Sequence, residues 1–104
     1  MRRTVAALLL VPCVAVAGVR PPPPPKAAQC ATCHGAEGIS TAPDAPNLAG
    51  QPKGYLEDQL RAFRDGKRIH PVMNVVAKPL SDADIDGLAR WYSSVEIDVR
   101  PLPP

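Results

Sequence analysis

Apolar residues recur at helical spacing in two stretches of the chain. In the range Lys53–Asp65, Leu56, Leu60 and Phe63 stand at i, i+4 and i+7, so they share one face of a helix. A second apolar stripe follows Ser81 and consists of Ile85, Leu88, Ala89, Tyr92 and Val95. No stretch alternates between apolar and polar residues, as a half-buried strand would. The pattern predicts an all-α fold.

Local signals indicate where these two helices begin and end. Pro52 precedes the helix predicted over Lys53–Asp65, and Gly66 follows it at the position where helices commonly stop. Ser81 is a suitable N-cap for the helix that contains the second stripe, and Asp84 three positions later completes a variant of the capping box. Both helices therefore have definite predicted boundaries.

A third, shorter helix is predicted over Lys26–Cys33, because Pro25 stands where a first helical turn tolerates proline. Segments 35–52 and 66–80 are rich in Pro, Gly, Asn and small residues. Such segments are typical of loops. We therefore expect three helices joined by long loops.

The first seventeen residues have the layout of a secretory signal peptide. Basic Arg2 and Arg3 precede the apolar run Val5–Val16, and Ala15-Val16-Ala17 predicts cleavage after Ala17. The alternative is a membrane anchor, but about 15 apolar residues interrupted by Pro12 fall short of the roughly 20 that a spanning helix needs. We expect export to the periplasm and no stable membrane insertion after cleavage.

Cleavage changes the charge and the cysteine count. The whole chain has 12 Lys+Arg and 10 Asp+Glu, and loss of residues 1–17 leaves ten of each. The absence of any basic cluster argues against a nucleic-acid partner. Cys13 would leave with the signal, although lipidation is an alternative that Pro12 disfavours, so the mature chain keeps one pair, Cys30 and Cys33.

Two further segments flank the predicted domain. Residues 18–25 include the run Pro21–Pro25, which predicts a stiff polyproline spacer. Residues 99–104 contain three prolines and are expected to be a frayed tail. The domain therefore spans residues 26–98. It contains only four aromatic residues. A core this small and poor in large side chains indicates that something besides side chains fills it.

The motif Cys30-Ala31-Thr32-Cys33-His34 indicates the chemistry of the domain. C-x-x-C-H is the attachment signature of c-type haem. Two thiols three positions apart lie on one face of a helical turn and can form thioether bonds with both vinyl groups of one porphyrin. The adjacent His34 can bind the iron from the proximal side, while its second ring nitrogen needs an acceptor that fixes the ring.

Three other interpretations of the cysteine pair are weaker. A thioredoxin-like dithiol needs a βαβ setting and leaves His34 unexplained. A zinc site needs a fourth ligand, and His70 is the one remaining His or Cys unless acidic residues take part. A disulfide between such near neighbours closes a small loop and stabilises little.

The second axial ligand would decide what such a haem does. After cleavage the candidates are Met73 and His70. Met73 is then the one methionine left, 39 residues beyond His34 in a predicted loop between Pro71 and Pro79. A thioether ligand raises the reduction potential, as it does in His/Met cytochromes. We expect Met73 to be the ligand and His70 to be exposed.

The sequence resembles class I c-type cytochromes, especially short periplasmic bacterial ones and single halves of di-haem cytochromes. The resemblance covers about residues 28–95. It rests on the haem motif with Gly35, on Ala45-Pro46-Asn47-Leu48-Ala49-Gly50-Gln51, on Tyr55-Leu56-Glu57-Asp58-Gln59-Leu60, Phe63-Arg64-Asp65-Gly66 and Met73, and on Leu80-Ser81-Asp82-Ala83-Asp84-Ile85 and Trp91-Tyr92.

The resemblance implies a small cytochrome c-like fold, three or four helices around one covalent haem c. Cys30 and Cys33 would carry the haem, and His34 and Met73 would bind its iron. The carbonyl of Pro46 would accept a hydrogen bond from His34. Other residues would line the pocket or pack behind it, namely Leu48, Leu60, Ile85, Leu88, and Trp91 or Tyr92.

The function implied is that of an electron carrier, not an enzyme, serving donor and acceptor proteins that the sequence does not identify. The alternatives are a haem enzyme or gas or redox sensor with a labile sixth ligand, and a cytochrome subunit of a larger oxidoreductase. A monomer or a subunit of a redox complex is expected. One departure from the family concerns the helix that carries the haem motif. In the family this helix normally extends about two turns before the haem cysteines and packs across the last helix. Here Pro21–Pro25 occupies that stretch, so only about one turn remains.

Overall fold

The computed structural model describes residues 11–15 and 18–104, so most of the predicted signal peptide lies outside the described residues. Four helices follow in the order α1 (Ala27–His34), α2 (Lys53–Arg64), α3 (Met73–Ala77) and α4 (Asp82–Ser93). No strand occurs in the described part of the chain. The all-α prediction is confirmed. Among these residues, no helix has the length and apolar character needed to cross a membrane.

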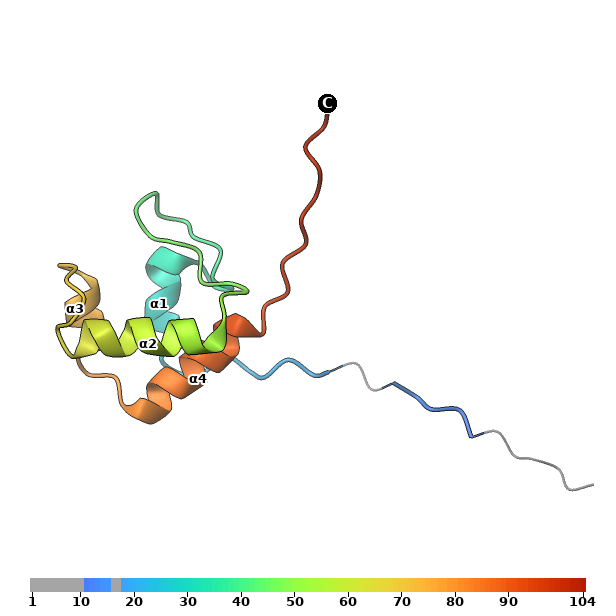
Figure 1. Cartoon of the computed structure of the whole chain (residues 1–104), viewed down its shortest axis with the longest axis horizontal. Coiled ribbons are helices and arrows are strands. Elements are labelled where there is room, and N and C mark those ends of the chain that lie inside the picture. The colour runs from blue at the N-terminus through green and yellow to red at the C-terminus, as the bar shows by residue number, and fades with distance from the viewer. Residues whose placement is uncertain (1–10, 16–17) are drawn as a thin grey trace, which may run out of the picture.

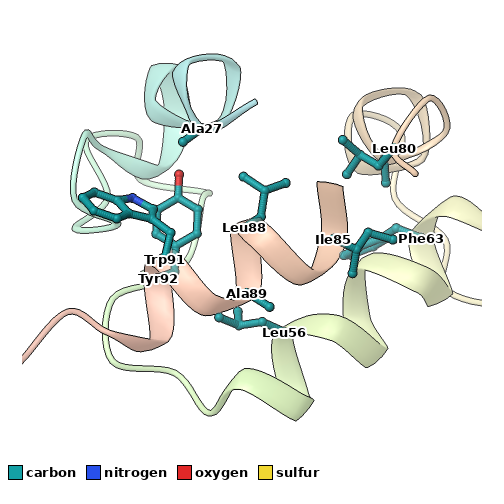
Figure 2. Close-up of a cluster of buried hydrophobic side chains, with 10 residues drawn as sticks. Ala27, Leu56, Phe63, Leu80, Ile85, Leu88, Ala89, Trp91 and Tyr92 are labelled. Atoms are coloured by element: carbon teal, nitrogen blue, oxygen red, sulfur yellow. The ribbon is translucent and has the colours of Figure 1, made fainter. Parts of the chain in front are cut away.

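Helices α2 and α4 form the base of the domain, with α1 on one side of them and α3 at the end of α2 (Figure 1). Their apolar stripes meet as predicted. Figure 2 shows Leu56 of α2 beside Ala89 of α4, and Phe63 beside Ile85. Ile85 is fully buried, and Leu88 is 1% exposed. Burying two such side chains contributes on the order of 2 kcal/mol each.

Polar contacts fix the start of both long helices. The Ser81 hydroxyl accepts a hydrogen bond from the Asp84 amide, and the Asp84 carboxylate accepts one from the Ser81 amide, both at 3.0 Å. This is the predicted capping box. Near the start of α2, the Lys53 ammonium lies 2.8 Å from Asp86 of α4 and 2.9 Å from Glu57. The two helices are therefore tied by charge as well as by their apolar stripes.

The segment predicted as the loop 66–80 contains the five-residue helix α3. Side chains make this short helix possible. Nδ1 of His70 accepts from the amides of Val72 and Met73, both at 3.2 Å, and Oδ1 of Asn74 accepts from the His70 amide at 2.7 Å. The Asn74 amide group also donates to the carbonyls of Phe63 and Arg68. Hydrogen bonds that cap backbone amides, and not an apolar stripe, therefore form α3.

The proline segment lies against α4. We call residues 20–25 the strap. The Arg20 guanidinium lies 3.7 Å from the centre of the Trp91 ring and 3.1 Å from the Glu37 carboxylate. Pro24 faces Gly87 of α4, where a β-carbon would be 3.7 Å from the proline Cβ. The strap therefore packs on α4 at Gly87 and Trp91. At the other end, residues 99–104 are exposed coil and extend away from the helices (Figure 1).

Candidate functional site

A cavity of about 360 Å³ opens between α1, the loop after it, α2, α3 and α4. Its lining is mostly apolar, and the lining residues come from all parts of the domain sequence, from α1 to α4. All seven residues predicted to bind a cofactor line this cavity: Cys30, Cys33, His34, Pro46, Leu48, Leu60 and Met73. In Figure 2, Leu88 and Tyr92 point from α4 toward α1 and the space beside it, and both line the cavity. Of the two aromatic candidates, Tyr92 is a lining residue, whereas Trp91 packs under Arg20.

The end of α1 brings both cysteines and His34 to one wall. The helix stops at Gly35, whose φ of +81° is unfavourable for any residue with a side chain. A β-carbon there would also overlap the carbonyl oxygen of Ile39. The chain can therefore turn directly after His34, and the hydroxyl of Ser40 returns to donate to the carbonyl of Cys33 at 3.2 Å.

A single hydrogen bond fixes the ring of His34. Nδ1 of His34 lies 2.7 Å from the carbonyl oxygen of Pro46, and the histidine is 8% exposed. Because a carbonyl only accepts, Nδ1 carries the proton and Nε2 is left as a lone-pair donor on a residue that lines the cavity. The predicted contact between His34 and Pro46 is present.

The loop that carries Pro46 is itself held in place. The amides of Leu48 and Ala49 donate to the carbonyl of Gly38 at 2.8 and 3.1 Å. Gly38 has a φ of +83°, and a β-carbon there would lie 2.7 Å from the Ala49 nitrogen and 2.8 Å from Tyr92. This close approach needs glycine. The acceptor for His34 is therefore part of a tightly packed loop and has little freedom to move.

Met73 lines the same cavity from α3. It is the first residue of α3, is partly buried, and packs against the hydrophobic core. His70 also lines the cavity but is exposed, as predicted, and its Nδ1 accepts hydrogen bonds from the backbone of α3. The two candidate ligands therefore have different surroundings: a thioether in the core, and an imidazole that caps a helix.

The cavity wall near Cys30 contains a buried hydroxyl without a partner. The hydroxyl of Tyr92 forms no hydrogen bond. Burial, together with the neighbouring Cys30 thiol, raises the pKa of Tyr92 well above its usual range, although the two groups do not meet with hydrogen-bond geometry. Burial likewise raises the pKa of the Cys30 thiol. A buried hydroxyl without a protein partner at a cavity wall is consistent with a cavity that binds a non-protein group.

The donor set fits haem c. Two thiols, an imidazole with a free nitrogen and a thioether line one apolar cavity, and imidazole and thioether are both ligands of haem iron. Within residues 11–15 and 18–104, no three His, Cys, Asp or Glu side chains converge on a point that could hold a metal ion by themselves.

Sequence reasoning missed part of the lining. Val72 and Val76 line the cavity on either side of Met73, and Arg68 and Gln59 add polar groups joined by a 2.6 Å hydrogen bond. The signal that could have found the valines is their helical spacing around Met73, which is recognisable only once α3 is known to be a helix. No pattern pointed to the arginine or the glutamine.

These features define a c-type haem protein. The chain matches the family model described as Cytochrome c over residues 26–96, and it belongs to the cytochrome c family. Members of this family bind haem c covalently, and haem c is the cofactor of this chain.

Known relatives agree with this assignment. The chain is 49% identical over 81 residues to a thiosulfate dehydrogenase electron acceptor from Thiomonas intermedia, covering 77% of this chain and 37% of that protein. It is 45% identical over 74 residues to cytochrome c-554(548) from Halomonas halodenitrificans, covering 68% of this chain and 89% of that cytochrome.

A solved structure of a cytochrome c4 from Acidithiobacillus ferrooxidans superposes with a TM-score of 0.60 at 39% identity, covering 64% of this chain and 38% of that one. The chain therefore spans little more than a third of that cytochrome and of the Thiomonas protein, and nearly the whole of the Halomonas cytochrome. The fold is that of a class I c-type cytochrome.

Proposed function

We propose that this chain is an electron carrier in which Cys30 and Cys33 hold one haem c by thioether bonds while His34 and Met73 bind its iron. The observation that carries this proposal is the 2.7 Å contact between Nδ1 of His34 and the Pro46 carbonyl. It fixes the ring and leaves the other nitrogen for a metal. Met73, which lines the same cavity from α3, supplies the second donor.

When bound, haem c supplies an iron that changes between Fe(III) and Fe(II). The residues of the chain set the conditions for that change. His34, held by Pro46, is a strong and fixed donor, and the Met73 thioether favours the reduced state. Apolar residues such as Leu48, Leu60 and Leu88 exclude water from the cavity, which also favours the state of lower charge.

The partners of such a carrier are redox proteins. Two relatives, from Thiomonas intermedia and Stutzerimonas stutzeri, are named thiosulfate dehydrogenase electron acceptors. These names support a redox enzyme as the electron donor of this chain. The acceptor is a second redox protein.

We place the carrier in the periplasm, with the signal peptide removed after Ala17. The basic start, the apolar run and Ala15-Val16-Ala17 support this location. The test is the intact mass of protein purified from the periplasmic fraction. The expected species begins at Gly18 and carries one haem. A species that retains residues 1–17 in the membrane fraction would contradict cleavage.

Covalent attachment is tested by expressing the full chain with a haem-attachment system and extracting the purified protein with acidified acetone. The wild type should keep its haem, and Cys30→Ser/Cys33→Ser should lose all of it. Cys13→Ser is the control for expression and export, because Cys13 leaves with the signal peptide and the mature protein should keep its haem. Haem that is extracted from the wild type would contradict the proposal, as would a purified protein with no reversible reduction and reoxidation.

A further inference from the structure

The hydroxyl of Tyr92 is buried without a protein partner, although the ring that carries it is held firmly. Tyr92 is 2% exposed. Its ring lies directly against Gly38, where a β-carbon would be 2.8 Å from the ring, and its carbonyl accepts from the Gly50 amide at 3.0 Å. The hydroxyl at the end of this ring therefore has a fixed position. Because a buried hydroxyl without an acceptor disfavours the folded state, its acceptor in the complete protein has to be found.

The side chain of Tyr92 reaches α1 beside Cys30. Figure 2 shows it pointing from α4 toward Ala27 of α1, and Cys30 is about one turn further along that helix. Cys30 is half-buried and packs against the core that contains Tyr92. Burial raises the pKa of both groups, and each also affects the pKa of the other, as close neighbours do. The second haem cysteine, Cys33, is exposed. The buried hydroxyl therefore belongs to the surroundings of Cys30.

The free thiol of Cys30 already has a partner. Its Sγ donates to the carbonyl of Lys26 at 3.6 Å, which uses its one hydrogen. When a thiol adds to a vinyl group, the sulfur bonds to one vinyl carbon and the hydrogen goes to the other. The resulting thioether sulfur has lone pairs and no hydrogen, so it accepts hydrogen bonds and cannot donate them. Attachment at Cys30 therefore ends the bond to Lys26 and leaves an acceptor beside a donor that lacks one.

We propose that Tyr92 is a positioning residue for the cofactor, and that its hydroxyl donates a hydrogen bond to the thioether sulfur of Cys30 in the holoprotein. This inference rests on the proposed function. The bond gives the buried hydroxyl the acceptor that the free thiol does not supply, and it ties one of the two attachment points to α4. Because burial raises the pKa of Tyr92 well above its usual range, the hydroxyl keeps its proton and remains a donor.

This hydrogen bond would also affect the electron carrier itself. A donor at the sulfur draws electron density away from the attached cofactor, and hydrogen bonds of this kind around a metal centre tune its reduction potential. Lower electron density favours Fe(II) over Fe(III). Tyr92 would therefore contribute to both stability and the redox equilibrium, whereas a residue that merely packs against the core would contribute to stability alone.

Tyr92→Phe in the full holoprotein removes the hydroxyl and keeps the ring. We expect the ratio of folded to unfolded holoprotein, measured by urea titration, to fall about fivefold. In a spectroelectrochemical titration, the ratio of Fe(II) to Fe(III) at a fixed applied potential should fall about twofold. Tyr55→Phe is the matched control, because Tyr55 is 49% exposed and its hydroxyl can bond to water. This control should leave both ratios nearly unchanged.

Proton NMR of the reduced holoprotein identifies the acceptor. A buried, hydrogen-bonded hydroxyl exchanges slowly with water, so its proton should give a separate resonance. We expect that resonance in the wild type and in Tyr55→Phe, and its absence in Tyr92→Phe. Its strongest nuclear Overhauser contact outside the tyrosine ring should be with the β-protons of Cys30.

A Tyr92→Phe holoprotein that is as stable as the wild type, or more stable, would overturn the proposal, because removal of an unpaired buried hydroxyl is neutral or favourable. Lost stability with an unchanged redox equilibrium would reduce Tyr92 to a packing residue and contradict the proposal as well. A hydroxyl proton whose strongest contact is with water or with a haem propionate would assign it another acceptor. A wild type without covalent haem contradicts the proposed function, whereas covalent haem with a silent Tyr92→Phe contradicts this inference alone.

Discussion

Two walls of the same cavity are built in different ways. The His34 wall consists of α1 and residues 35–51, and the Met73 wall consists of residues 66–77. In the first wall, glycines with positive φ bring backbone against backbone, and the His34 ring is buried and fixed by Pro46. In the second wall, α3 is five residues long, several side chains are exposed, His70 caps the first amides of the helix, and Asn74 bonds to the turn before it. One wall is held by the backbone, and the other by side chains.

The difference indicates a division of labour. The His34 wall carries the covalent attachment and the fixed ligand, so any displacement of its backbone would disturb the cofactor. The Met73 wall supplies a ligand from a five-residue helix that side-chain hydrogen bonds hold in place. Substitutions of the same chemical kind should therefore have unequal effects on the two walls.

The largest contrast is expected for glycine to alanine. Gly35→Ala should destabilise the holoprotein by about 3 kcal/mol or more, because positive φ and overlap with the Ile39 carbonyl add together. Gly66→Ala on the Met73 wall keeps the φ penalty but meets nothing within 4 Å, so it should cost about 1 kcal/mol. Urea unfolding and the yield of covalent haem measure the loss in each variant. An equal loss of stability in Gly35→Ala and Gly66→Ala would contradict the comparison.

A smaller effect is expected at His70. His70→Ala removes the acceptor for the amides of Val72 and Met73 and should weaken α3 by about 1 kcal/mol. Met73 would then leave its place more often, and carbon monoxide should bind the reduced protein about fivefold faster. His70→Asn is the control, because its side-chain oxygen can replace Nδ1 as the cap. Failure of asparagine to restore slow binding would show that capping is not the role of His70.

The strap should matter less again, and for stability alone. Arg20→Ala removes the cation over Trp91, a contact worth under about 1 kcal/mol at a partly exposed site. The urea midpoint should fall slightly while the reduction potential stays unchanged. Arg100→Ala in the tail is the matched control and should change neither quantity. A shift in potential for Arg20→Ala would show that the strap acts on the cofactor site and not just on α4.

The smallest effect is a dependence of stability on pH at the base of the domain. Hydrogen bonds from Lys53 and Arg90 lower the pKa of Asp86 from 3.8 to about 2. Because the folded pKa is depressed, this contribution is complete above 3.8 and is lost as the pH falls through about 2. Asp86→Asn should therefore lower the urea midpoint at pH 6 but not at the acid end. Asp98→Asn is the control. If the urea midpoint of Asp86→Asn stays below that of the wild type at low pH, the lowered pKa of Asp86 is not the cause of the difference.

Much of the fold followed from the sequence because its signals are local. The stripe of α2, the capping box of Ser81 and Asp84, and the motif from Cys30 to His34 all act within a few residues. The contact between His34 and Pro46 came from the resemblance to the family, because nothing in the loop sequence by itself selects one carbonyl as the acceptor.

Two features had no readable signal. The helix α3 is too short to show periodicity, and the residues whose side chains hold it, His70 and Asn74, also suit a loop. The docking of Arg20 on Trp91 joins residues far apart in the chain, and a proline run on its own predicts stiffness but not the surface against which it packs. Both depend on tertiary contacts.

The central claim is that His34 and Met73 bind the iron from opposite walls, and proton NMR of the reduced holoprotein tests it most directly. A methionine bound to haem iron lies over the porphyrin face, so its methyl resonance should be shifted far upfield by the ring current. We predict one such resonance in the wild type and none in Met73→Leu, which should still carry covalent haem. A wild-type spectrum without that resonance, or a Met73→Leu spectrum that keeps it, would contradict the account.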